Sequence, residues 1–315
     1  MDDGERANFV RNLVRLLGDA VLGRGPLPWI WRRRNRHRLV VLAYHGVDDR
    51  ESFARHLDHI ARHHSVVSID EVLAARNGGR LPTNAVLITF DDGERTVLTD
   101  GLPELERRSM PSVLFAIAGF IDTDDPFWWY EVEELHARGG RIDGFDPDLP
   151  AQAVIAALKN ISDDQRLAAL DSLRSSVAGD GHRQEQLSAD ELRRLDEAGM
   201  HVGNHSLTHP LLDRCSDEKI RREVMDADVR LEAILGRAIR AFAYPNGNVD
   251  ERIAAAVRAS GAEVAFLFDH KVSAPVPEDA MYVSRVRVNS DCSMDRFVAL
   301  VCGVHSTVHT LRGGG

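Results

Sequence analysis

Short apolar runs alternate with amphipathic segments along most of the chain. The apolar runs have the length of buried strands, whereas the amphipathic segments repeat apolar residues about every three to four positions, as surface helices do. The predicted strands are residues 39–44, 66–69, 85–90, 112–118, 200–203, 239–243, 263–268 and 282–288, and the predicted helices include 102–108, 189–198, 220–235 and 251–259. This alternation predicts an α/β fold with a parallel sheet. We expect a closed or nearly closed barrel, with an open doubly wound sheet as the alternative, because the strands are too many and too evenly spread for two small domains.

Residues 120–187 interrupt this alternation. They carry several aspartates, the aromatic cluster at 127–130 and two helical patterns, at 151–158 and 163–177. Because no linker composition isolates this stretch, we expect a helical insertion on the barrel rather than a separate domain. The predicted organisation is an extension over residues 1–38, a barrel over 39–305 with the insertion, and a flexible tail over 306–315.

The extension combines an amphipathic helix pattern with a basic cluster. Its apolar residues at helical spacing are Phe9, Val10, Leu13, Val14, Leu16, Leu17 and Leu22, and they precede Trp29, Trp31 and the arginines Arg32, Arg33, Arg34, Arg36 and Arg38. Such a segment can dock on an anionic membrane surface. The alternative is a helix that packs on the outside of the barrel and leaves its arginines in water.

Charge and cysteine content narrow the class of protein. The chain has 315 residues and a net charge of −10, which argues against nucleic-acid binding. The three cysteines have unrelated spacings and match neither a zinc ribbon nor a disulfide framework. The acidic start differs from a secretory signal, and no apolar run reaches the ~18 residues of a membrane span. We therefore expect a cytoplasmic protein, peripheral at the inner membrane face if the extension docks there.

Polar residues follow two of the predicted strands. Asp91 and Asp92 come after the strand at 85–90, and His205 and His209 come after the strand at 200–203. In a barrel of this kind the carboxyl ends of the strands present catalytic groups on one face. Two histidines and a carboxylate are a common catalytic zinc set that leaves a position for water. The alternatives are a surface histidine pair and a solvated helix cap, but adjacent buried carboxylates are costly without a positive partner, so we favour a metal.

Three ordered motifs resemble the signature of the polysaccharide deacetylase family, the NodB-homology group also called carbohydrate esterase family four. They are TFDDG at residues 89–93, HSLTH at 205–209 and FAYPNG at 242–247, and the resemblance extends from about residue 39 to about residue 300. It implies a distorted (β/α)7 barrel that removes the N-acetyl group from an acetamido sugar and releases acetate. The YHG at 44–46 and SRV at 284–286 resemble the branch that acts on exopolysaccharides.

The resemblance also implies residue roles. Asp91 would be the general base, and Asp92, His205 and His209 would hold a divalent metal. Zn²⁺ is the first choice, with Co²⁺ and Mn²⁺ as alternatives, because this ligand set suits several ions. A backbone N–H from the loop after Phe242, with Tyr244 and Asn246 as candidates, would stabilise the oxyanion.

Two departures from the family pattern leave roles open. Ala243 stands where many members carry an arginine that braces the base; Arg285 is our first candidate for this role and Arg240 the second, against surface roles for both. No clean Leu-x-His motif supplies the general acid. His45 ranks first for that role, against a structural role beneath the metal, and the other histidines considered are His270, His305 and His309.

The remaining expectations concern the substrate. Trp128 and Trp129 either stack on a sugar ring or pack the insertion onto the barrel. A cytoplasmic protein would act on a glycan precursor, so a lipid-linked or nucleotide-linked N-acetylated sugar fits best. The alternatives are an O-deacetylase, another amide hydrolase on the same scaffold, and a non-catalytic glycan-binding barrel, which the intact aspartates and histidines disfavour.

Overall fold

A curled parallel sheet forms the centre of the protein. The structure, a computed structural model, describes residues 18–179, 183–274 and 279–311. The strands follow the order β7-β6-β5-β4-β3-β1-β8, β2 pairs with β3, and every pairing is parallel. Their bounds are β1 Val40–Tyr44, β2 Ser65–Val66, β3 Ala85–Phe90, β4 Ser112–Ala116, β5 Met200–Asn204, β6 Ala241–Ala243, β7 Val264–Phe266 and β8 Val286–Arg287.

The segment that leads into β8 joins the two edges of the sheet. Val283 donates its N–H to the Ala265 carbonyl (3.0 Å) and accepts the N–H of Leu267 (2.8 Å) beside β7. Three residues later, Val286 pairs with Leu42 of β1. The sheet therefore curls into a distorted barrel, as the sequence predicts, and the open doubly wound alternative is wrong.

Alternate residues of the strands enter two different apolar clusters. Val41, Leu87 and Phe115 lie in one cluster with residues of β6 and β7, inside the curled sheet. Leu42 and Ile88 lie in the other, with residues of the surrounding helices. Because successive side chains of a strand point to opposite faces, a strand covered on both faces becomes a continuous apolar run.

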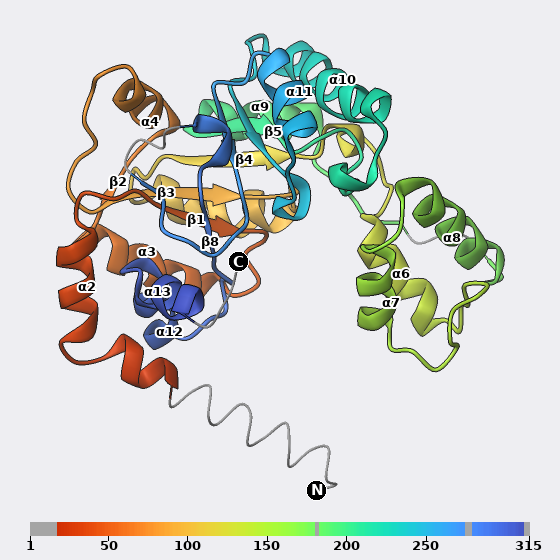
Figure 1. Cartoon of the computed structure of the whole chain (residues 1–315), viewed down its shortest axis with the longest axis horizontal. Coiled ribbons are helices and arrows are strands. Elements are labelled where there is room, and N and C mark those ends of the chain that lie inside the picture. The colour runs from red at the N-terminus through yellow and green to blue at the C-terminus, as the bar shows by residue number, and fades with distance from the viewer. Residues whose placement is uncertain (1–17, 180–182, 275–278, 312–315) are drawn as a thin grey trace, which may run out of the picture.

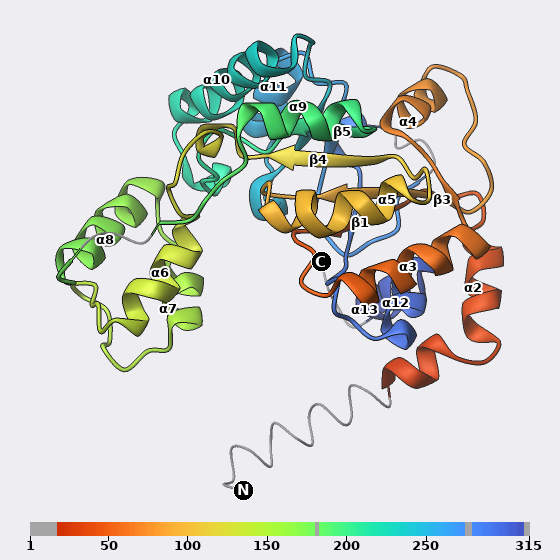
Figure 2. The ribbon, with the colours of Figure 1, turned by 180° about the vertical axis from the view of Figure 1, so that it is seen from behind.

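Helices cover the outside of the barrel, with α3 and α12 on one side and α9 to α11 on the other (Figures 1 and 2). The structure has these helices: α2 Leu27–Asn35, α3 Arg50–His63, α4 Ile69–Arg76, α5 Leu102–Glu106, α6 Trp128–Ala137, α7 Ala151–Leu158, α8 Asp163–Ser175, α9 Ala189–Glu197, α10 Asp217–Leu235, α11 Glu251–Ala259, α12 Met294–Val301 and α13 Val304–Leu311. The insertion, α6 to α8, forms a lobe beyond the carboxyl ends of β3 and β4 (Figure 1). It encloses an apolar cluster of its own, which includes Val132, Leu158 and Leu170.

The two ends of the described chain pack together. Trp31 of α2 donates its indole N–H to the Thr307 hydroxyl (2.9 Å), and Asn35 donates to the Cys302 carbonyl (2.9 Å). The helix α13 continues to Leu311, so residues 306–311, which the sequence analysis assigned to a tail, are helical. Residues 312–315 and the apolar positions before residue 18 lie outside the described part of the chain.

The exposed side of α2 carries Trp29 and Ile30, which are 57% and 43% exposed. Within the described residues, no helix combines the length and apolar character needed to cross a membrane.

Candidate active site

A cleft of about 320 Å³ opens at the carboxyl ends of the strands. Its wall contains residues from both the barrel and the insertion: His45, Gly46, Asp48, Asp91, Asp92, Glu94, Trp129, Tyr130, Lys159, His205, His209, Tyr244, Asn246, Phe268, Arg287, Val288, Asn289 and Ser290. The barrel thus brings together the polar residues that follow its strands in the sequence.

Asp92, His205 and His209 form a compact set of ligand atoms. One side-chain atom from each lies within 4.8 Å of the other two. Oδ1 of Asp92 is 3.4 Å from Nε2 of His205 and 3.5 Å from Nε2 of His209. This Oδ1 is buried and makes no hydrogen bond to any described residue. A buried carboxylate oxygen facing two imidazole nitrogens fits a divalent cation.

A hydrogen bond fixes the tautomer of His205. Its Nδ1 lies 2.7 Å from the carbonyl oxygen of Ala243. A carbonyl only accepts, so Nδ1 carries the proton and Nε2 keeps its lone pair toward Asp92. Ala243, which replaces the family arginine, therefore still serves the site through its backbone.

The candidate ligands sit on strained backbone. Asp92, Ser206 and His209 have φ values of 70°, 68° and 57°, a region that costs a residue with a side chain about 1–3 kcal/mol. Hydrogen bonds hold the strained loop: Ser206 donates its N–H to Asn204 Oδ1 (2.6 Å), and its hydroxyl accepts the N–H of His209 (3.0 Å). Clustered strain of this kind is typical of functional sites.

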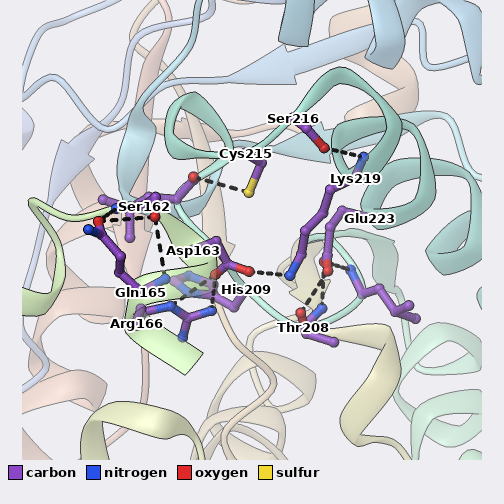
Figure 3. A network of polar contacts seen from close by, with 12 residues as sticks. Ser162, Asp163, Gln165, Arg166, Thr208, His209, Cys215, Ser216, Lys219 and Glu223 are labelled. Carbon is purple, nitrogen blue, oxygen red and sulfur yellow. Dashed lines mark hydrogen bonds and ion pairs between the residues drawn. The ribbon is translucent and has the colours of Figure 1, made fainter. Parts of the chain in front are cut away.

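Glu223 of α10 holds the same loop from behind. Its carboxylate accepts the N–H of Leu207 (3.1 Å), the N–H of Thr208 (2.8 Å) and the Thr208 hydroxyl (2.7 Å). Figure 3 shows Glu223 pointing at Thr208, one residue from His209. Burial raises the pKa of Glu223, although these hydrogen bonds oppose the rise. The sequence analysis missed this residue, but its position between Ile220 and Val224 on the buried face of a helix was a usable signal.

An ion pair joins the same region to the insertion. Asp163, the first residue of α8, contacts the ammonium of Lys219 in α10 and the guanidinium of Arg166 (Figure 3). Asp163 and Arg166 are both buried. This contact holds the start of α8 in the insertion against α10, the helix whose Glu223 holds the loop of His209.

Asp91 is paired with Arg285 inside the barrel. Nη1 and Nη2 of Arg285 donate to Oδ1 and Oδ2 of Asp91 at 2.7 and 2.8 Å, and its Nε donates to the Leu267 carbonyl at 2.7 Å. The guanidinium lies between the rings of Phe115 and Phe268. Burial raises the pKa of Asp91, but the charge and hydrogen bonds of Arg285, together with the charges of His205 and His45, outweigh this effect, so the pKa lies below its usual range.

Arg285, the first candidate for the arginine that holds the base, is therefore paired with Asp91, the candidate base. Arg240, the second candidate, is elsewhere: it pairs with Asp70 and Glu263 at the amino-terminal end of β6.

The loop after β6 offers a single free N–H among the three residues considered. Tyr244 donates its N–H to the Phe266 carbonyl (3.1 Å), and Pro245 has none. Asn246 adopts the left-handed conformation (φ 57°), and its N–H has no hydrogen bond to a described residue. Asn246 is thus the remaining oxyanion donor, whereas the ring of Tyr244 packs into the apolar cluster with Ile253.

The candidate acids lie at different distances from the cleft. His45 lines it, with its ring edge on Phe268 at 5.6 Å between centroids. His270 lies near Phe268 (5.5 Å between ring centroids) and does not line the cleft, and His305 lies on α13. The side chain of His309 is outside the described part of the structure.

The two insertion tryptophans separate. Trp129 lines the cleft, and its ring lies 4.9 Å from that of His209. Trp128 does not reach the cleft; it is buried in the insertion under the guanidinium of Arg166. Adjacent residues of a helix point about 100° apart, and in α6 this rotation directs Trp129 to the cleft and Trp128 into the insertion.

The insertion contributes two more cleft residues that the sequence analysis missed. The Tyr130 hydroxyl donates to Glu94 Oε1 (2.6 Å), and the Lys159 ammonium donates to Asn246 Oδ1 (3.3 Å). Burial raises the pKa of Glu94, and the nearby charge of Asp92 adds to the rise. The aromatic cluster was the only signal for Tyr130, and no local pattern indicated Lys159.

Comparisons with known proteins agree with this geometry. Residues 78–144 and 157–265 match the sequence model of the polysaccharide deacetylase family. A Streptococcus pyogenes deacetylase, PplD, in complex with acetate superposes with a TM-score of 0.59 at 15% identity, over 84% of this chain and 98% of that one. IcaB from Ammonifex degensii gives 0.58 at 22%, over 85% and 98%. A de-N-acetylase from Aggregatibacter actinomycetemcomitans gives 0.56 at 17%, over 84% and 99%. Among curated proteins no sequence matches.

Proposed function

Because this chain belongs to the polysaccharide deacetylase family, we propose that it is a metal-dependent hydrolase that removes the N-acetyl group from an acetamido sugar. The observation that carries the proposal is the pairing of two sites in one cleft: the Asp92, His205 and His209 ligand set, and Asp91 braced by Arg285. A de-N-acetylase among the structural neighbours makes nitrogen, rather than oxygen, the first choice.

The ligand set would hold Zn²⁺ by preference, with Co²⁺ and Mn²⁺ as alternatives. When bound, such an ion lowers the pKa of a water molecule toward ~7 and polarises the acetyl carbonyl. The His205 tautomer and the buried Asp92 oxygen are already arranged for it.

Three groups of the protein accept a proton, stabilise the oxyanion and donate a proton. Asp91, kept ionised by Arg285, accepts the proton of the attacking water. The Asn246 N–H donates to the oxyanion as the carbonyl is attacked. His45, on the cleft wall, is the proposed donor to the departing amine.

The cleft sets the scale of the substrate. A volume of about 320 Å³ is at the small end for ligand pockets, which suits a single sugar with its acetamido group. Trp129 provides an aromatic wall for the sugar ring beside His209.

We also propose a cytoplasmic location with a peripheral membrane contact. Trp29 and Ile30 are exposed on α2 among the arginines of the extension. Apolar side chains flanked by cations bind anionic bilayers. Removing residues 1–38 should abolish binding to vesicles that contain phosphatidylglycerol; unchanged binding would contradict this contact.

The activity is tested by acetate release from N-acetylated sugars and from matched O-acetyl esters, with metal supplied. Hydrolysis of the amides supports the proposal, and hydrolysis of the esters alone would make the protein an O-deacetylase. Binding without any acetate release would indicate a glycan-binding barrel.

A further inference from the structure

Two cations line the cleft that the proposed reaction does not use. Lys159 caps the carboxyl end of α7 in the insertion, and Arg287 ends β8 of the barrel. Neither forms an ion pair with any residue that the structure describes. Many other arginines of this acidic chain are paired, as Arg95 is with Glu191 (2.9 Å).

Their surroundings keep both cations available to a ligand. Arg287 lies over the ring of Phe268 (5.9 Å to the centroid) and donates from Nε to Asn289 Oδ1 (3.3 Å), so the Nη groups have no partner among the described residues. Lys159 has one neutral acceptor, Oδ1 of Asn246. Burial lowers the pKa of Lys159; the negative charge of Asp92 opposes this shift, and the positive charge of Arg287 adds to it. Two cations held near each other without an anion are unfavourable until one binds.

The acids of the cleft form no ion pair with these two cations in the described structure, although the charge of Asp92 acts on Lys159. Glu94 accepts the Tyr130 hydroxyl, and Asp48 accepts the Ser290 hydroxyl (3.5 Å). Neither carboxylate forms an ion pair with Lys159 or Arg287 in the described structure.

We propose that Lys159 and Arg287 bind a phosphate attached to the acetamido sugar, so that the substrate is a phosphate-linked sugar. This inference rests on the proposed function and adds the substrate class. A phosphate ester carries enough charge to balance two cations, and a guanidinium matches its oxygens with two parallel hydrogen bonds. A nucleotide diphosphate and a polyprenyl phosphate share this chemistry.

The test compares one sugar with and without phosphate. Acetate release is measured from methyl N-acetylglucosaminide, N-acetylglucosamine 1-phosphate, its uridine diphosphate form and its short-chain polyprenyl diphosphate form. We expect the phosphate-linked forms to have a kcat/KM about tenfold or more above that of the methyl glycoside. The better substrate of the uridine diphosphate and polyprenyl diphosphate forms identifies whether the phosphate belongs to a nucleotide or to a lipid carrier.

The preference is the ratio of kcat/KM for a phosphate-linked sugar to kcat/KM for the methyl glycoside. Arg287→Gln and Lys159→Gln should each lower this ratio by about tenfold, whereas Lys159→Arg should retain it. Arg80→Gln is the matched control, because Arg80 is exposed and outside the cleft, and it should leave the preference intact. Arg287 is itself exposed, so its replacement should not unfold the protein.

The outcomes separate the two proposals. Equal hydrolysis of neutral and phosphate-linked sugars, or a preference that survives Arg287→Gln, overturns the phosphate site and leaves the deacetylase standing. If no sugar releases acetate, calorimetric binding of glucosamine 1-phosphate decides: weaker binding to Arg287→Gln than to the unmodified protein supports the site, and equal binding overturns it.

Discussion

The barrel and the insertion contribute to one cleft in different ways. The barrel supplies Asp91, Asp92, His205 and His209, all buried at the ends of strands. Arg285 holds Asp91, and hydrogen bonds hold the ring of His205 and the backbone of His209. The insertion supplies Trp129, Tyr130 and Lys159, which are partly exposed; Tyr130 and Lys159 each make one side-chain hydrogen bond in the cleft, and Trp129 makes ring contacts. Groups that transfer protons need fixed positions, whereas groups that recognise a substrate tolerate a looser frame. Changes in the barrel should therefore affect turnover and stability, and changes in the insertion should affect binding.

The largest effect is expected from Asp91→Asn. Loss of a general base costs about 10²–10⁴-fold in rate, while the adjacent ligand set remains. We expect kcat for acetate release to fall by that factor with the metal content, measured by mass spectrometry, unchanged. Asp92→Asn is the matched control and should lose both activity and metal. Metal loss in both variants would contradict separate roles for Asp91 as base and Asp92 as metal ligand.

Arg285→Met should destabilise the barrel. It leaves the Asp91 carboxylate buried and unpaired, which costs about 3–5 kcal/mol in the free energy of unfolding measured by denaturant titration. Because the ion pair lowers the pKa of Asp91, its contribution is present above pH ~4 and is lost as the pH falls through the lowered pKa. The variant should thus lose stability at neutral pH and much less under acid, and the acid limb of its activity should move to higher pH.

Arg240→Met provides the comparison for that measurement. Its partners Asp70 and Glu263 are solvent-exposed, so we expect a loss of about 1 kcal/mol or less. Equal losses in the two arginine variants would argue against a special role for the buried pair.

Glu223→Gln should weaken metal binding. The change removes one acceptor from the three hydrogen bonds that hold the loop of His209, and residues that orient metal ligands typically affect affinity by about 10–100-fold. Competition with a zinc chelator measures the affinity. Glu232→Gln, at an exposed position of the same helix, should bind metal normally.

The smallest effect is expected from Trp129→Ala. Loss of the aromatic wall should raise KM by about tenfold and leave the metal content unchanged, because binding rather than chemistry is affected. Trp128→Phe, inside the insertion, should leave KM unchanged. A fall in kcat alone for Trp129→Ala would place this residue with the barrel groups instead.

The sequence predicted what local patterns determine. Buried strands appear as apolar runs, and the carboxyl ends of parallel strands meet, so Asp91, Asp92, His205 and His209 could be placed in one site from their positions after strands. Arg285 was a reasonable candidate for the same reason, since it lies beside a late strand.

The remainder depended on packing that no local pattern records. Trp128 and Trp129 differ only in the rotation of one helix against the barrel. Lys159 reaches the cleft where it contacts Asn246, after β6, and Glu223 reaches the loop of His209 through a tertiary contact with Thr208. The expectation of a flexible tail came from its glycines, and no local pattern indicates the contact of Thr307 with Trp31.

The closure of the barrel by the segment at Val283 has a consequence for the order in which the protein becomes active. Asp91 and Arg285 are 194 residues apart in the chain. A ribosome has therefore released the base and every candidate metal ligand well before it makes the arginine that holds the base in its ionised form. A nascent chain can gather its candidate metal ligands early, but Asp91, the proposed base, gains its arginine partner only when the last strand enters the sheet, so the proposed hydrolysis would begin with the completed molecule.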